Sequence, residues 1–146
     1  MLVKDLLKTK SKELVTISAS TKLKEAMESL INNKISCLPV LDDNSRLIGI
    51  ISDKDIFRHA YEKPAGFQDE TVGEVMTTNL IVGLVDDEVA YIAGIMTENR
   101  IRHVPIVERD HIIGLLSVGD IVKTQIENIR VENRYLWQYI EGTYPA

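Results

Sequence analysis

The sequence predicts an α/β protein in which one structural unit occurs twice. A motif of glycine, two aliphatic residues, serine, two variable residues and aspartate begins at Gly49 and again at Gly114, 65 residues later. Residues 36–40 and 102–106, each with proline as the fourth residue, match at an offset of 66. Internal repeats of this length indicate a duplicated fold. Each copy is predicted to run strand, helix, strand, strand, helix, which gives small sheets covered by helices.

The elements of the first copy follow from local patterns. Residues 1–7 have helical spacing, with Val3, Leu6 and Leu7 on one side, and residues 14–17 form a short strand rich in β-branched side chains. Ser20 and Thr21 offer an N-cap to a helix with an apolar face. The remaining predicted elements are a strand at 36–41, a hairpin turn at 42–45, a return strand at 47–51 and a helix at 53–61.

The predicted organisation has four parts. The first repeat spans residues 1–62, and the linker spans 63–71, where Lys-Pro-Ala-Gly interrupts the pattern. The second repeat spans 72–124, and a C-terminal helical extension spans 125–146. The first copy carries three extra residues around positions 8–14, because its start matches the second copy at an offset of 69.

Composition restricts the classes of function. The chain has 146 residues, a net charge of −5 and a pI of about 5.2, which disfavours a general binder of nucleic acid or anionic membranes. A single cysteine, Cys37, excludes an intrachain disulfide framework. No apolar run reaches the ~20 residues of a membrane span, and the N-terminus lacks a signal-peptide pattern. We therefore expect a cytoplasmic protein.

The last predicted helix continues well beyond the repeat, to about Glu141, with Gly142 as its stop. Six positions step by four, three, four, three and four residues, which is coiled-coil spacing with one polar residue in the seam: Val122, Ile126, Ile129, Asn133, Leu136 and Ile140. This seam predicts a homodimer. The alternative is a helix that folds back over its own domain, with Trp137 and Tyr139 filling a groove.

The repeated motif places polar groups at a helix start. Ser117 can hydrogen-bond a phosphate oxygen, and Asp120 can accept hydrogen bonds from two ribose hydroxyls. Their spacing places both groups on the first turn of one helix, where the backbone also favours anions. Plain N-capping is the competing interpretation, since Ser and Asp are common caps.

At these residues the sequence resembles the tandem cystathionine-β-synthase-type (CBS) domain pair, or Bateman module. Besides the duplicated motif, the Val-Met-Thr-Thr run at 75–78 and the Arg-His-Val-Pro run at 102–105 are similar to that family. The resemblance covers roughly residues 1–124 and is closest to small stand-alone members with a C-terminal helix. It implies two copies related by a pseudo-two-fold axis, with two clefts between them.

The resemblance implies a favoured nucleotide site on Ser117 and Asp120. Arg102, three residues before the strand proline, and Lys54, just before the aspartate of the other copy, would both approach its phosphate. Arginine offers a bidentate fork and lysine a compensating charge.

The resemblance also implies which residues of the favoured site contact the base and which add positive charge. Val82 and Gly83, with Val104 behind them, would form an adenine slot. His103 would add positive potential, or would be an ordinary packed or surface residue.

The second implied site is weaker. It is built on Ser52 and Asp55, and the residues matching Arg102 and Lys54 are Ser36 and Gly119, both uncharged. Thr16 and Ile17 would supply its adenine slot. The proline that the family often carries two residues beyond each slot is absent, since Ala19 and Val85 occupy those positions.

The resemblance implies a regulatory module that binds an adenine nucleotide, namely AMP, ADP, ATP or NAD(H), and passes the signal to a regulated protein. Two alternatives stay open: a structural or interaction module with empty clefts, and a pair that binds S-adenosylmethionine. We expect no catalysis, no required cofactor and no metal site, since His59, His103 and His111 lack metal-ligand spacing and no phosphate-binding glycine loop is present.

Overall fold

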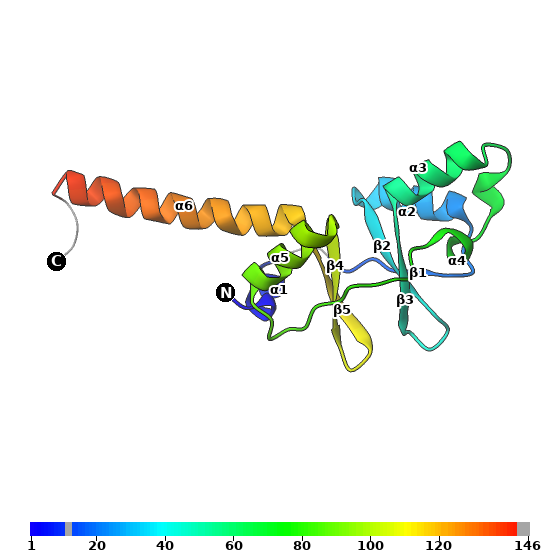
Figure 1. Cartoon of the computed structure of the whole chain (residues 1–146), viewed down its shortest axis with the longest axis horizontal. Coiled ribbons are helices and arrows are strands. Elements are labelled where there is room, and N and C mark those ends of the chain that lie inside the picture. Colours follow the sequence, from blue (N-terminus) through cyan, green and yellow to red (C-terminus); the bar gives the residue numbers. More distant parts are fainter. Residues whose placement is uncertain (11–12, 143–146) are drawn as a thin grey trace.

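Two α/β halves lie side by side in the computed structural model, which describes residues 1–10 and 13–142, and a long helix extends from one of them (Figure 1). The first half contains β1 (Ile17–Ser18), α2 (Leu23–Asn33), β2 (Cys37–Leu41), β3 (Leu47–Ser52) and α3 (Asp53–Glu62). The linker includes the short helix η1 (Phe67–Asp69). The second half contains α5 (Val89–Asn99), β4 (His103–Glu108), β5 (His111–Ser117) and α6 (Val118–Ile140). The predicted α/β fold class is confirmed.

The sheets of the two halves repeat one register. In the first, β1 pairs parallel to β2 through Ile17 and Val40, and β2 pairs antiparallel to β3. In the second, β4 and β5 pair antiparallel, and Gly83 makes a parallel bridge to Ile106. Ile17 and Val40 correspond to Gly83 and Ile106 at the same offset of 66. The duplication seen in the sequence is therefore a duplication of strand pairing.

The first helix of each repeat packs on the other repeat. Helix α1 (Val3–Thr9) belongs to the first repeat, but Val3 N–H donates to Asp87 O (2.9 Å), and Val3 and Leu6 lie in the core of the second half. Helix α4 (Val72–Val75) begins the second repeat, yet Val72 N–H donates to Thr21 O (2.7 Å) and its side chain lies in the core of the first half. The chain therefore crosses between the halves on both sides.

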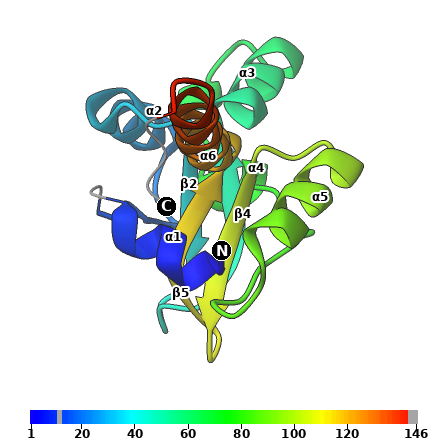
Figure 2. The same cartoon turned by 90° about the vertical axis from the view of Figure 1, so that its left-hand side faces the viewer.

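The motif glycines make room for the exchanged helices. A Cβ atom at Gly114 would lie 2.6 Å from Leu7 Cδ2 on α1, and one at Gly49 would lie 2.6 Å from Met76 Sδ just after α4. In Figures 1 and 2, α1 lies against β5. Glycine is needed at both positions, because another segment of the same chain occupies the space that a side chain would fill.

Only the first turns of α6 pack on the body. Ile121 and Thr124 are buried, whereas residues 125–137 are all exposed, and the helix projects away from both halves (Figures 1 and 2). The fold-back alternative does not describe this structure, because Trp137 is 63% and Tyr139 is 75% exposed. Gly142 follows the helix with φ of +73°, as expected of a C-terminal stop.

The described helices do not have the length and apolar character of membrane spans. None of those within residues 1–10 and 13–142 is both long and apolar enough to cross a bilayer.

The glycine contacts give a test of the helix exchange. Gly49→Ala should lower the free energy of unfolding by about 1–3 kcal/mol, because the added methyl group would crowd Met76 and lie 3.0 Å from the Thr77 carbonyl oxygen. Gly94→Ala is the control, since that position is exposed within α5 and has nothing within 4 Å. It should raise stability by roughly 0.5–1 kcal/mol. Urea unfolding of both variants measures this, and equal stabilisation by the two substitutions would contradict the close approach.

Candidate ligand-binding site

The two Ser-x-x-Asp motifs form the same capping box. Ser117 Oγ accepts a hydrogen bond from Asp120 N–H (3.1 Å), and Asp120 Oδ2 accepts one from Ser117 N–H (2.8 Å). Ser52 and Asp55 repeat this arrangement at the start of α3, at 3.2 and 3.0 Å. The capping interpretation therefore holds for both motifs, because each reciprocal pair satisfies backbone groups of a first helical turn. It leaves the remaining acceptor capacity of each carboxylate available.

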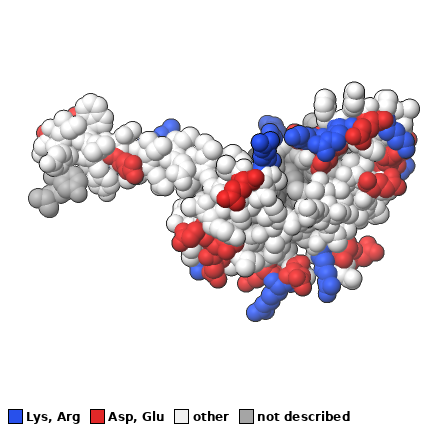
Figure 3. Space-filling model, viewed as in Figure 1, with Lys and Arg blue, Asp and Glu red and all other residues white. Residues whose placement is uncertain are grey.

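A cavity of about 600 Å³ lies between the halves, next to the second motif. Its size is in the range of small-molecule sites, ~300–1,000 Å³. The surface is hollowed between the two halves, with basic side chains along the rim (Figure 3). Both repeats contribute to the wall, which includes Lys10, Val15, Ser36, His103, Ser117 and Asp120.

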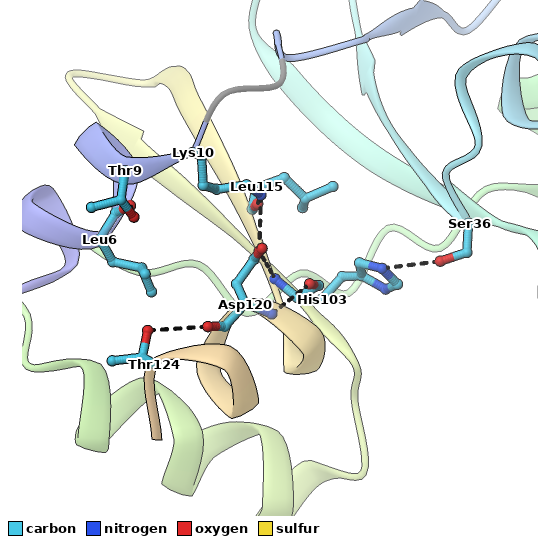
Figure 4. A network of polar contacts seen from close by, with 9 residues as sticks. Leu6, Thr9, Lys10, Ser36, His103, Leu115, Asp120 and Thr124 are labelled. Atoms are coloured by element: carbon cyan, nitrogen blue, oxygen red, sulfur yellow. Dashed lines mark hydrogen bonds and ion pairs between the residues drawn. The ribbon is translucent and has the colours of Figure 1, made fainter. Parts of the chain in front are cut away.

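Lys10 reaches into this cavity and contacts the motif aspartate. Its Nζ atom lies 2.9 Å from Asp120 Oδ2 and donates to the Leu115 carbonyl oxygen at 2.6 Å (Figure 4). Both side chains of the ion pair are largely buried, at 27% and 22% exposure. Partial burial raises the pKa of Asp120, but the hydrogen bonds from Lys10 and Ser117 outweigh it and hold that pKa below its ordinary value. The carboxylate is therefore charged and ready to accept hydrogen bonds.

His103 and Ser36 meet across the cavity from different repeats. The Ser36 Oγ and His103 Nε2 atoms are 3.2 Å apart (Figure 4). Burial, followed by the nearby charge of Arg102, lowers the pKa of His103 below its ordinary value. Near neutral pH this histidine is therefore a neutral hydrogen-bonding group, and it does not supply the positive potential that the sequence suggested.

The first motif lies in a more closed environment. Thr77 pairs its backbone with Ile50, at 3.0 and 2.8 Å, and its hydroxyl lies 3.4 and 3.5 Å from the two carboxylate oxygens of Asp55. The cavity beside Asp55 measures only about 210 Å³ and is lined by charged side chains of α3 together with Glu74 and Val75. The two motifs thus have unequal surroundings.

The inequality has a cause in the sequence. Leu115 in β5 corresponds to Ile50 in β3. At Ile50 the carbonyl accepts from the Thr77 backbone, whereas at Leu115 it accepts from the Lys10 side chain. The three extra residues around positions 8–14 lengthen the segment that follows α1. We attribute the larger cavity to this longer segment, because a flexible ammonium group replaces a paired backbone there.

The predicted adenine slot lies elsewhere. Gly83 N–H donates to Pro105 O (2.8 Å), and Gly83 faces the core of the second half, where Val104 is fully buried. Among the described residues that line the larger cavity, Leu14 and Val15 are present and Val82 and Gly83 are not. The helix exchange explains why Leu14 and Val15 lie here, because the segment after α1 crosses from the second half to the first; a slot at Val82 and Gly83 stays a prediction.

The residues predicted for the first site lie in different places in the structure. Ser36 lines the larger cavity beside His103, away from the site assigned to it. Ile17 pairs with Val40 in the sheet, and Thr16 precedes it. Ser52 and Asp55 stay together in their capping box.

The cations at the larger cavity differ from those predicted. The described lining contains Lys10 and Lys34, whereas Arg102 and Lys54 are outside it. Arg102 directly precedes β4, and its carbonyl accepts from the N–H of Val118, the first residue of α6 (3.0 Å). Lys54 is exposed in the first turn of α3. Sequence reasoning missed Lys10. The only signal for it was the local insertion.

Comparisons with known proteins bear on this cavity. The model of the CBS domain matches residues 3–62 and again residues 72–127. The mitochondrial CBS domain-containing protein CBSX3 of Arabidopsis thaliana is 31% identical over 124 residues, which cover 82% of this chain and 60% of that protein. The chain covers 22% of an L-aspartate semialdehyde sulfurtransferase from Methanocaldococcus jannaschii, at 33% identity. It therefore spans only part of these curated relatives.

Two similar solved structures hold ligands. The CBS domain pair of protein MJ0100, in complex with 5′-methylthioadenosine and S-adenosyl-L-methionine, has a TM-score of 0.77 and 30% identity, covering 88% of this chain and 98% of that one. CBSX2 in complex with AMP has a TM-score of 0.75 and 27% identity, covering 86% and 96%. All three ligands of these relatives contain an adenosine group.

Proposed function

The chain belongs to the CBS domain family, and we propose that it is a non-catalytic regulatory module that binds an adenosine-containing ligand between its two halves. The observation that carries the proposal is the cavity of about 600 Å³, which holds the charged Asp120 carboxylate and receives walls from both repeats. Ligands of this class occupy the similar pairs of MJ0100 and CBSX2.

Asp120 is the proposed ribose partner. Its contacts with Lys10 and with Ser117 N–H both fall on Oδ2. A ribose would place its two hydroxyls on the carboxylate and take the place of the Lys10 ammonium. Hydrogen bonds to a charged acceptor contribute about 1.5–3 kcal/mol each, which is enough to make this side chain decisive for affinity.

The base and the anionic end would use other parts of the wall. Leu14, Val15 and Ile35 offer apolar surface for an adenine ring. Lys10, once released from Asp120, and Lys34 offer positive charge to a phosphate. Arg102 and Lys54 remain proposed contributors to a phosphate that extends beyond the lining.

The two lysines favour AMP, ADP, ATP or NAD(H) as the ligand class, with no further cofactor, because once Asp120 holds the ribose only the Glu13 carboxylate of the lining opposes them. S-adenosylmethionine is the alternative, favoured by the ligands of MJ0100. It carries less negative charge than a nucleotide, so it would make less use of the two lysines.

Regulation would follow from the position of the cavity. A ligand that contacts both repeats favours one relative orientation of the halves, provided that its affinity differs between orientations. We propose that the module works as a homodimer and that a regulated protein responds to this change. The proposed compartment is the cytoplasm, where a free, buried Cys37 is expected to stay reduced.

The absence of catalysis is also part of the proposal. Burial, followed by the negative charges of Asp55 and Asp53, raises the pKa of the Cys37 thiol to about 12. A thiol with this pKa is protonated at neutral pH and is a poor nucleophile. An interaction module with an empty cavity is the second candidate function, and the Lys10–Asp120 ion pair favours it, because the buried carboxylate is already compensated without a ligand.

Calorimetric titration with AMP, ATP, NADH and S-adenosylmethionine tests the proposal. We expect saturable binding of at least one ligand, and Asp120→Ala should weaken it by about tenfold or more through loss of the ribose acceptor. Asp55→Ala is the matched control, since it removes the equivalent carboxylate from the smaller cavity, and it should leave affinity nearly unchanged. Absence of binding by all four ligands would favour the interaction module. Equal losses in both variants would contradict the assignment to Asp120.

The role of Lys10 gives a separate prediction. Lys10→Met should weaken AMP binding by about tenfold through loss of a charge partner for the phosphate. The same change should leave adenosine binding unchanged or tighter, because Asp120 loses its internal competitor. Lys8→Met, an exposed neighbour in α1, is the control and should alter neither affinity. If Lys10→Met changed the affinities for AMP and adenosine to the same extent, the Lys10 ammonium group would not move from Asp120 to the phosphate on binding.

A further inference from the structure

We infer that two copies of the chain associate through a parallel, in-register coiled coil of their α6 helices, with Asn133 facing Asn133 across the seam. This inference rests on the homodimer of the proposed function and uses none of its ligand chemistry. The partner that covers the exposed face of α6 is the α6 helix of a second copy of the chain.

The seam is exposed along its whole length. The alternating spacing of three and four residues assigns three side chains to heptad position a and three to position d. Five of the six are large aliphatic residues, with exposed fractions of 44–73%: Val122, Ile126, Ile129, Leu136 and Ile140. An isolated helix gains little stability from propensity alone, so covering this stripe is the main stabilisation open to the projecting part of α6.

The seam also points away from the rest of the molecule. Ile121 and Thr124 are the α6 residues buried against the body. At 3.6 residues per turn, the mean direction of the seam lies about 130° around the helix axis from the mean direction of these two. A second helix can therefore approach on the free side. A two-fold axis along the seam would place the two bodies on opposite outer sides of the coiled coil.

Asn133 selects the parallel orientation. It occupies an a position, and the other a positions are Ile126 and Ile140. In a parallel, in-register pair, each a residue faces its own copy, so two Asn133 amides can hydrogen-bond to each other. In an antiparallel pair, a faces d, and the d residues here are Val122, Ile129 and Leu136, which would leave the amide without a partner. A single asparagine at an a position also restricts the register and the number of strands.

Sedimentation of the full chain tests whether this face is used. We expect a dimer for the wild type and for Val131→Lys. For Ile129→Lys, we expect the dissociation constant of the dimer to rise at least a hundredfold. Val131 is a matched control, because it lies on the same helix outside the seam and is 53% exposed against 54% for Ile129. A dimer that survives Ile129→Lys unchanged would overturn the coiled coil while leaving the homodimer intact. A monomeric wild type would overturn both.

Orientation is tested by oxidation. Leu136→Cys, which keeps Asn133, should form a disulfide-linked dimer in the absence of reductant, whereas Val131→Cys should not, because only the seam of a parallel, in-register pair brings equivalent positions face to face. Cys37 is 1% exposed and does not compete. Dimers without the Leu136→Cys cross-link would overturn the parallel register. Calorimetry on the same variants separates this result from ligand binding, since residues 125–137 are exposed and do not line the larger cavity.

Discussion

The exchange of α1 and α4 between the two repeats is the constraint on which the rest of this structure depends. Val3 and Val72 are fully buried, each in the core of the opposite repeat. Because neither core is complete without the helix of the other, the halves are held together by the same apolar burial that folds them. Each crossing segment must then pass between the halves, beside the helix that begins with the Ser-x-x-Asp motif.

The two crossing segments differ, and this makes the surroundings of the two motifs chemically different. At Asp55, the crossing chain pairs its backbone at Thr77 with β3 and leaves little space. At Asp120, a longer crossing segment places the Lys10 side chain, which is long, flexible and displaceable, against the carboxylate, and Leu14 and Val15 of the same segment also line the cavity. One repeat thus keeps a closed structural cap, and the other combines a cap with a cavity. We favour one of the two duplicated motifs as the site because three inserted residues change the donor to the strand carbonyl. Leu115 O accepts from the Lys10 side chain, whereas Ile50 O accepts from the Thr77 backbone.

Local patterns were enough to predict the fold class, the paired elements and the capping motifs, since these depend on residues close in sequence. The helix exchange was not predictable in this way, because an apolar stripe on α1 indicates that the helix packs on a core but not on which of the two cores. The adenine slot was therefore placed at Val82 and Gly83, whereas Leu14 and Val15 line the larger cavity. Lys10 carried no motif, and Arg102 was favoured over it by resemblance alone. The seam of α6 was predictable because its apolar residues repeat about every 3.5 residues, which is the period of a coiled coil.

The central claim is that an adenosine ligand binds at Asp120 and displaces Lys10. A crystal structure of the chain with bound AMP tests it most directly, through the distance between Lys10 Nζ and Asp120 Oδ2, which is 2.9 Å without ligand. We predict ribose hydroxyls on Asp120 and an ammonium group moved out of hydrogen-bond range, toward the phosphate. AMP seated at Asp55, or bound in the larger cavity with the ion pair intact, would contradict the account.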